Sequence, residues 1–366
     1  MANLSAREGG RGGGLRMLLT VGTVLVAAVI TGIALRLSSP GNPGASQNPI
    51  SSVISPSPST SGSQSKPSSP IPSAAPTPFV PTSWVLRAIP LPPGHEDGIV
   101  LAVSPDASVV LFRDASVYDQ MFIAHDNGEL NEILVPNHVA GAPIRARLSP
   151  DGTFALVWEL GHLWRYDIPS HEIARVPDAP GTDGSGPFVF LSNTSVALLT
   201  GPIASGELGG QTNSQLWLLD LSAMSYAKLG SRHDGIALYP ITGGVALLAD
   251  HSRNHDNTGW VLYRIAGDGA ETLMFDAGGS FSIAVSRDGS RIAASRGHLG
   301  TDGTWAVDLP RQVSRRISSG AAVDFSPDGR LLRVDFSGGP AESLQWDGTI
   351  VNTVDSAQTA AWVGLP

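Results

Sequence analysis

Ser149-Pro150-Asp151-Gly152 joins two short apolar runs, and closely similar turns recur along the chain. Proline fixes φ, aspartate hydrogen-bonds the backbone next to it, and glycine accepts a positive φ, so each of these residues favours a tight turn. Each copy therefore predicts a β-hairpin. The other clear copies are Ser104-Pro105-Asp106-Ala107, Ser286-Arg287-Asp288-Gly289 and Ser326-Pro327-Asp328-Gly329.

Weaker copies of the turn lie between the second and third clear ones, at Leu191-Ser192-Asn193-Thr194 and Ile241-Thr242-Gly243-Gly244. The six starts lie about 40 to 50 residues apart, a period typical of propeller blades. In the repeat at residues 144–176, four strand-like runs fit around the turn. The sequence therefore predicts an all-β fold, a six-bladed β-propeller with four strands to each blade.

The third run of several repeats carries a second signature, Trp-x-x-Asp. It begins at Trp164, Trp217 and Trp305, and Trp260 and Trp346 hold the equivalent place in their own repeats. One tryptophan per repeat at the same strand position favours packing between blades over a sugar-binding platform.

Together, the Ser-Pro-Asp-Gly turn, the apolar strand after it and the aromatic-x-x-Asp strand resemble the WD40-like repeat of TolB-type six-bladed propellers. The resemblance covers residues 99–356, with clear motifs in four of the six repeats. It implies the fold and not a function, because that family spans periplasmic partner-binding proteins, peptidase-associated propellers and lactonase-like enzymes. No hydrolase domain follows the repeats and no α/β domain precedes them, so neither peptidase nor translocation activity is implied.

The strand-like runs at residues 84–91 and 360–365 belong to no complete repeat. We expect them to join the two chain ends in a shared blade, which would remove exposed strand edges. A seventh blade built from both ends is the alternative.

The N-terminal part has the pattern of a membrane anchor. Residues 17–35, between Arg16 and Arg36, carry no charge. This uncharged stretch is long enough to span a bilayer as a helix. Arginines before this stretch predict a cytoplasmic tail at 1–16, an anchor helix at 17–37, and an exported chain after it. Residues 38–83 are rich in proline and serine and predict a disordered linker to a propeller at 84–366. The chain is thus expected in the cell membrane, in a single pass, and a cleaved signal peptide is the alternative.

Charge and cysteine content limit the function. The chain has 23 Lys+Arg and 32 Asp+Glu, and residues 1–83 hold five of the basic residues but only one acidic residue. The repeat region is therefore strongly acidic, which argues against nucleic acid or anionic lipid as its partner. The chain has no cysteine, so disulfides and thiol catalysis are excluded.

Long loops on a rigid scaffold often carry function, and three consecutive repeats have long ones at residues 201–213, 250–259 and 296–303. We expect them on the face opposite the Pro-Asp-Gly turns, beside a connection that contains Arg232, His233 and Asp234. These loops are a small-ligand or peptide site, a transition-metal site or plain solvated loops, and the spacing of the histidines does not specify a metal. The candidate ligand-binding residues are His251, Arg253, His255, Asp256, Arg296, His298 and Asp302.

Charged residues on the innermost strands form a second candidate site. Most repeats have apolar or small residues there, but the second has Arg145 and Arg147 and the sixth has Asp324. Charges near the axis often line a water-filled channel, where Arg145 or Arg147 would bind a carboxylate or phosphate of a ligand. An ion pair inside the channel is the alternative.

The sequence has no Gly-x-Ser-x-Gly elbow, no phosphate-binding loop ending in Gly-Lys and no His-Glu-x-x-His. We therefore predict a monomeric binding or scaffold module for a protein, peptide or envelope polymer, with no catalytic residues and no cofactor. A metal-dependent hydrolase of the lactonase or phosphoesterase type, centred on the channel, is the alternative. The sensor end of a signalling protein is a third hypothesis.

Overall fold

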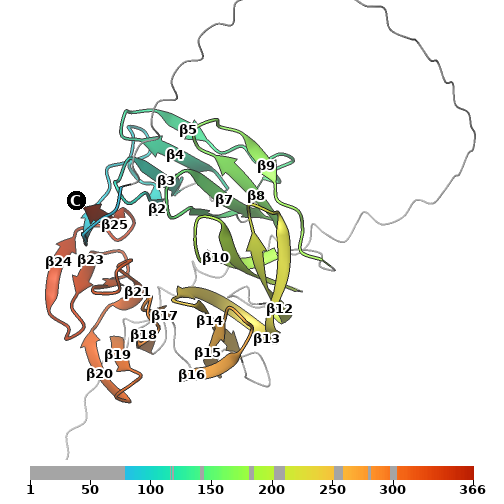
Figure 1. Cartoon of the computed structure of the whole chain (residues 1–366). Helices are drawn as coiled ribbons and strands as arrows, with labels where there is room; N and C mark the ends of the chain where they lie inside the picture. The colour runs from blue at the N-terminus through green and yellow to red at the C-terminus, as the bar shows by residue number, and fades with distance from the viewer. Residues whose placement is uncertain are drawn as a thin grey trace, which may run out of the picture. The chain divides into compact units, whose positions relative to one another are not determined.

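Figure 1 shows the computed structural model of the chain. It describes residues 79–115, 117, 119–140, 144–180, 185–201, 211–250, 259–278, 282–296 and 303–366. All of these belong to the second of two compact units, Ala74–Pro366. The expected tail, anchor helix and linker up to residue 78 lie outside the described residues. Within the described part, no helix is long and apolar enough to cross a membrane.

The described residues form an all-β, propeller-like arrangement of sheets, as predicted (Figure 1). Four sheets have four antiparallel strands that neighbour one another in chain order. The first two consist of β2 (Ile99–Val103), β3 (Val109–Arg113), β4 (Met121–His125) and β5 (Leu130–Glu132), and of β6 (Ile144–Leu148), β7 (Phe154–Glu159), β8 (His162–Asp167) and β9 (Ile173–Arg175). The other two consist of β17 (Ser282–Val285), β18 (Arg291–Arg296), β19 (Gly303–Asp308) and β20 (Val313–Ser318), and of β21 (Ala321–Phe325), β22 (Leu332–Asp335), β23 (Ala341–Leu344) and β24 (Ile350–Val354).

The third and fourth repeats share one seven-stranded sheet. Its strands are β10 (Ser185–Phe190), β11 (Ser195–Thr200), β12 (Gln211–Asp220), β13 (Ser225–Ile241), β14 (Gly244–Asp250), β15 (Trp260–Ala266) and β16 (Glu271–Gly278). The 17-residue β13 pairs with β12 through its first part and with β14 through its second. Gly235 lies where the two parts meet, and a Cβ there would approach Leu199 Cδ1 to 2.5 Å, so this close contact requires glycine.

The two ends of the described chain pair with each other, as predicted. β1 (Ser83–Ala88) runs antiparallel to β25 (Ala360–Leu365), from Ser83 opposite Leu365 to Ala88 opposite Ala360. The two ends therefore share a sheet, and this sheet is separate from the four-stranded sheets of the first and last repeats. The pair forms a two-stranded sheet of its own, with β1 beside β24 and β25 beside β2.

The four clear turn motifs fold in the same way. In each, the serine hydroxyl donates to the Oδ1 of the aspartate two residues later, at 2.6 to 2.7 Å. The same hydroxyl accepts the backbone N–H five residues later, at 2.9 to 3.1 Å. The serines are at most 2% exposed, so these bonds replace the water that the hydroxyls lose on folding.

Apolar clusters between neighbouring repeats hold the sheets together. Trp217 packs with Trp158 and Phe188, which belong to the second and third repeats. Trp260 packs with Ile241 and Ile292, which belong to the fourth and fifth. Both tryptophans are at most 5% exposed, which confirms that they pack between blades.

Candidate functional site

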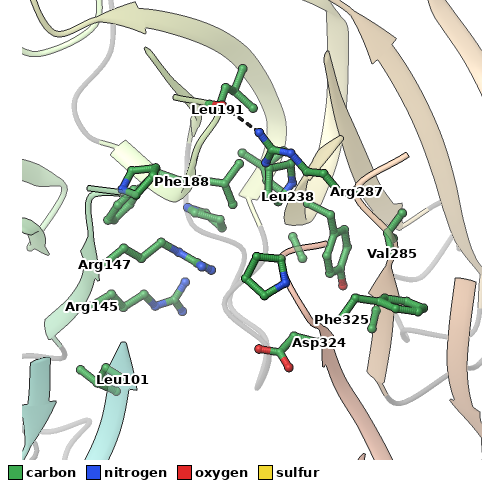
Figure 2. A pocket seen from close by; sticks show the side chains of 18 of the residues that line it. Leu101, Arg145, Arg147, Phe188, Leu191, Leu238, Val285, Arg287, Asp324 and Phe325 are labelled. Atoms are coloured by element: carbon green, nitrogen blue, oxygen red, sulfur yellow. Dashed lines mark hydrogen bonds between the residues drawn. The ribbon is translucent and has the colours of Figure 1, made fainter. Parts of the chain in front are cut away.

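A cavity of about 1100 Å³ lies among the innermost strands of the repeats (Figure 2). All six innermost segments contribute to its wall, from β2, β6, β10, β13, β17 and β21. Its charged lining residues are Arg113, Arg145, Arg147, Arg287 and Asp324. The cavity therefore contains more positive than negative groups, although the chain as a whole has a net charge of −9.

Arg145 and Arg147 both come from β6. Alternate residues of a strand share one face, and these two are exposed while Ile144 and Leu148 at the strand ends are buried. Figure 2 shows both side chains pointing into the cavity from the same wall. The structure therefore places both arginines in the cavity among the innermost strands, as predicted.

Neither guanidinium of this pair donates a hydrogen bond to another described residue or forms an ion pair with one. Arg145 lies 5.6 Å from the ring centroid of Trp158, close enough for a cation–π interaction. Arg147 is exposed to the cavity, but the surrounding protein removes much of its hydration, and this burial lowers its pKa. The nearby charge of Arg145 also lowers that pKa, while Tyr239 and Asp324 oppose the effect.

Asp324 lies on a different wall of the cavity, on β21. A β-bulge interrupts the pairing of β21 with β22 between Ala322 and Asp324, and such bulges re-aim side chains. The indole N–H of Trp362 donates to Asp324 Oδ1 at 2.9 Å. Burial raises the pKa of Asp324 most strongly, while the charge of Arg333 and the Trp362 hydrogen bond act in the opposite direction.

Arg287 belongs to this site but was missed by the sequence analysis. It takes the place of proline in the turn Ser286-Arg287-Asp288-Gly289, and its guanidinium donates to the carbonyl of Leu191 at 2.9 Å. Burial lowers its pKa. The departure from proline in one copy of the turn is a sequence signal that could have identified it. Arg113, at the end of β3, was also missed and had no such signal.

The described lining residues of this cavity include none of the loop residues proposed from the sequence. His251, Arg253, His255, Asp256, His298 and Asp302 lie outside the described residues, and only the backbone of Arg296, the last residue of β18, is described. The cavity wall includes Pro150 and Pro327, so the cavity extends to the Pro-Asp-Gly turns, opposite the face where we expected the ligand. A smaller cavity of about 420 Å³ is lined by Trp260, Ser282 and Ala321, the first residues of β15, β17 and β21.

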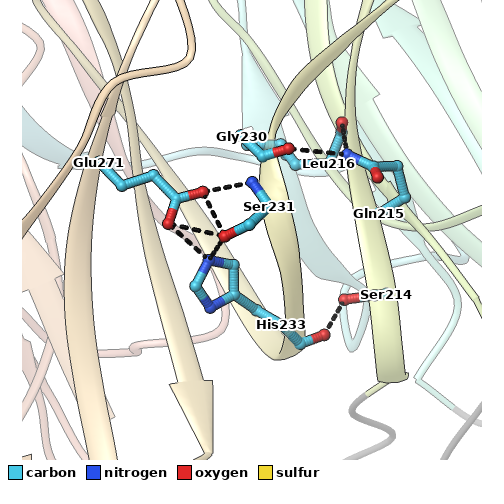
Figure 3. Close-up of polar contacts among 7 residues, drawn as sticks. All are labelled: Ser214, Gln215, Leu216, Gly230, Ser231, His233 and Glu271. Carbon is cyan, nitrogen blue, oxygen red and sulfur yellow. Dashed lines mark hydrogen bonds and ion pairs between the residues drawn. The ribbon is translucent and has the colours of Figure 1, made fainter.

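Arg232, His233 and Asp234, which we expected in a connection between blades, lie within the strand β13, and His233 belongs to a separate polar cluster there (Figure 3). Ser231 Oγ donates to the carboxylate of Glu271 at 2.7 Å, and His233 Nε2 lies 3.2 Å from the same group. Burial alone would raise the pKa of Glu271, but the hydrogen bonds from Ser231 and the charge of His233 lower it overall. Ser231 and His233 of β13 both contact Glu271 of β16, so this cluster links the two strands.

The described residues hold no group of three or more His, Cys, Asp or Glu side chains that could bind a metal ion. The three histidines proposed from the sequence, His251, His255 and His298, lie outside these described residues.

No family model and no curated protein matches this sequence. Solved structures similar to the chain include TolB from Acinetobacter baumannii, with 17% identity, a TM-score of 0.46, and coverage of 73% of this chain and 66% of the TolB chain. An oligogalacturonate lyase in complex with manganese has 16% identity, a TM-score of 0.50, and coverage of 70% and 76%. Hsv2 from Kluyveromyces lactis has 13% identity, a TM-score of 0.42, and coverage of 68% and 75%. The chain thus spans just under two thirds of TolB, and the likeness to the lyase supports the β-propeller fold alone.

Proposed function

We propose that this chain is a binding module whose central cavity receives an anionic group of a protein, peptide or envelope polymer. The observation that carries the proposal is the convergence of Arg145, Arg147 and Arg287 on one cavity that contains a single carboxylate, Asp324, among its described lining residues. Guanidinium groups bind carboxylates and phosphates through two parallel hydrogen bonds. An anionic ligand would supply acceptors to Arg145 and Arg147, which donate no hydrogen bond to another described residue.

The electrostatics of the cavity favour the same ligand. Protein walls of low dielectric strengthen the field of the arginines, and a concave site concentrates that field. The chain as a whole is acidic, with a net charge of −9, so the excess of arginines in this cavity sets it apart from the average of the chain. A ligand with an exposed acidic segment would therefore be guided to the arginines.

The size of the cavity supports a segment of a larger molecule. Pockets for drug-sized ligands span roughly 300 to 1000 Å³, and this cavity has about 1100 Å³. Its apolar residues, among them Phe188 and Phe325, add contact area for the uncharged parts of such a segment.

We also propose six blades, with the two parts of β13 serving as the outer strand of the third and the inner strand of the fourth.

Residues 17–37 would anchor the protein in the cell membrane in a single pass, with residues 1–16 in the cytoplasm and the propeller outside. The uncharged stretch between Arg16 and Arg36 supports the anchor. Protease digestion of the propeller in intact cells tests the orientation.

Calorimetric titration of the full-length chain with capped hexaglutamate tests the binding function, with capped hexaglutamine as the neutral control peptide. We expect hexaglutamate to bind and hexaglutamine not to bind. Arg147→Gln should weaken the binding by about 1.5–3 kcal/mol, the usual contribution of a hydrogen bond to a charged group.

Arg311→Gln is the matched control, because Arg311 is 81% exposed and does not line the cavity. It should bind hexaglutamate as the unmodified chain does. Equal affinities of the Arg147 and Arg311 variants would contradict the proposal, and so would the absence of hexaglutamate binding.

A further inference from the structure

We infer that the cavity recognises zwitterionic ligands, with an anionic group at Arg145 and Arg147 and a cationic group at Asp324. This inference rests on the proposed binding function and specifies the chemistry of its ligand. The positions of the charged groups in the cavity support this inference.

The opposite charges in the cavity are separated. Figure 2 shows Arg145 and Arg147 on one wall and Asp324 on another, with open space between them. No ion pair joins either arginine to Asp324 among the contacts of the described residues. An internal ion pair, the alternative weighed from the sequence, is therefore not what these residues form.

Asp324 is held in a fixed position with one oxygen free. Trp362 Nε1 donates to its Oδ1, and Trp362 is itself 8% exposed on β25. Within the described part of the chain, Oδ2 accepts no hydrogen bond. A buried indole thus orients the carboxyl group while leaving an acceptor available to the cavity.

Arg333, the nearest cationic partner for Asp324, is already engaged. Its guanidinium donates two hydrogen bonds of 2.8 Å to Asp335 and further bonds to the carbonyls of Ala357 and Ala360. These contacts occupy the donors of its planar guanidinium, so the guanidinium forms no ion pair with Asp324. Its positive charge lowers the pKa of Asp324 without such a pair. The cationic partner that Asp324 lacks within the protein can be supplied by a ligand.

A carboxylate in this cavity weakens the binding of a purely anionic ligand, because like charges repel. It strengthens the binding of a ligand that also has an ammonium group placed near it. Such a group would offset the burial that raises the pKa of Asp324 and would favour its ionised form. Phe325, the next residue on β21, also lines the cavity, and an aromatic ring near the ligand adds attraction for a cation.

The ligand class is therefore a molecule with a carboxylate or phosphate and an ammonium group a short distance apart. A peptide with neighbouring acidic and basic side chains has this chemistry, and so does a free amino acid. The two sources are separated by their probes, capped peptides for the first and 6-aminohexanoate for the second.

The test is calorimetric titration of the full-length chain with capped peptides Glu-(Gly)n-Lys, with zero to three glycines. Each is compared with the peptide in which Gln replaces Lys, and 6-aminohexanoate is compared with hexanoate. We expect the zwitterionic peptide of at least one length to bind about ten-fold or more tightly than its Gln counterpart, because it gains a charge-assisted contact. The same preference for 6-aminohexanoate would show that a free small zwitterion is sufficient.

Asp324→Asn should remove this preference and leave the affinity for the Gln peptide unchanged or slightly higher. Asparagine keeps an Oδ1 that accepts from Trp362, and the thermal unfolding of the variant shows whether the fold is kept. Asp126→Asn, at an exposed turn position after β4, is the matched control and should keep the preference.

If the unmodified chain shows no preference for the zwitterionic peptide at any length, the inference is overturned. This measurement needs no variant. An equal loss of affinity for both peptides in Asp324→Asn would also overturn it. A chain that binds hexaglutamate but shows no preference keeps the proposed binding function and loses only the zwitterion. A chain that binds none of the probes loses both.

Discussion

At the scale of single residues, the turn motif shows why the fold could be predicted from the sequence. In each turn the serine and the aspartate are joined by a hydrogen bond and also bond to the nearby backbone. The turn therefore forms from residues within five positions of one another. In three copies the fourth residue is a glycine with φ of +71° to +73°. In the first copy it is Ala107, with φ of 61°.

Ala107→Gly should stabilise the protein by about 0.5–1 kcal/mol. A side chain in the left-handed region costs roughly 1–2 kcal/mol, and glycine removes this cost but loses more backbone entropy on folding, which cancels part of the gain. Gly152→Ala should have the opposite effect, since its Cβ would lie 2.7 Å from Ser104 Cβ at a φ of +73°. Urea denaturation of both variants measures the two changes. A loss of stability in Ala107→Gly would mean that the packing of its methyl group against the apolar cluster around Phe112 outweighs the backbone strain.

The candidate site could be predicted only in part. Arg145 and Arg147 were found because charges stand out on an otherwise apolar innermost strand. The free oxygen of Asp324 could not be foreseen, because it depends on Trp362, 38 residues later, and on the partners that Arg333 has taken. Such contacts between distant segments leave no local pattern in a sequence.

At the scale of elements, His138 shows how the first two repeats are joined. It lies between β5 and β6, with Nδ1 2.7 Å from Glu159 Oε1 and Nε2 3.2 Å from Asp119 Oδ2. The backbone N–H of Val139 also donates to Glu159 Oε1, at 3.0 Å. Glu159 is 4% exposed, so these contacts compensate for the burial of its charge. No motif in the sequence indicated this cluster.

The His138 contact should make stability depend on pH. Burial alone would lower the pKa of His138, but the hydrogen bonds and charges of Glu159 and Asp119 raise it above the ordinary value of 6.5. A raised pKa means that the folded state holds the proton more tightly than the unfolded state. The stabilisation is therefore complete below pH 6.5 and is lost as the pH rises through the folded-state pKa.

We expect the difference in free energy of unfolding between the unmodified chain and His138→Gln to be largest in mild acid and to shrink as the pH is raised. Glutamine can still donate to one carboxylate but does not titrate in this range. Urea denaturation of both proteins between about pH 5 and 8 measures the difference. A difference that stays constant over this range, or that grows toward alkaline pH, would show that the proton on His138 does not stabilise the fold.

At the scale of the whole domain, the sequence predicted what depends on local periodicity. Hairpins and the pairing of the two ends follow from turn residues and from unassigned strand-like runs. The merging of the third and fourth repeats was not predicted, because it depends on β13 staying continuous through Gly235 and on its close packing against Leu199. The separate sheet of β1 and β25 depends likewise on how many strands the neighbouring sheets already hold.

The sheet of β1 and β25 closes the ring of sheets and is coupled to the cavity. Leu86 of β1 is fully buried and packs with Trp362, Ala341 and Val354. The backbone carbonyl of Leu86 accepts a hydrogen bond from Asn352 Nδ2 at 2.5 Å. Trp362, on the partner strand, holds Asp324. Loss of this packing should therefore affect both the stability of the whole domain and the cavity wall.

Leu86→Ala should lower the free energy of unfolding by about 2–4 kcal/mol, because it removes a large buried side chain and leaves a void between β1 and β24. Arg87→Ala, at the next and exposed position, is the control and should change stability by no more than about 0.5 kcal/mol. Urea denaturation followed by tryptophan fluorescence measures both. Because the sheet joins the first and last repeats, Leu86→Ala should shift a single transition without changing its slope. A separate early transition, with the main one unmoved, would show that β1 and β25 detach locally and that the other sheets hold together without them.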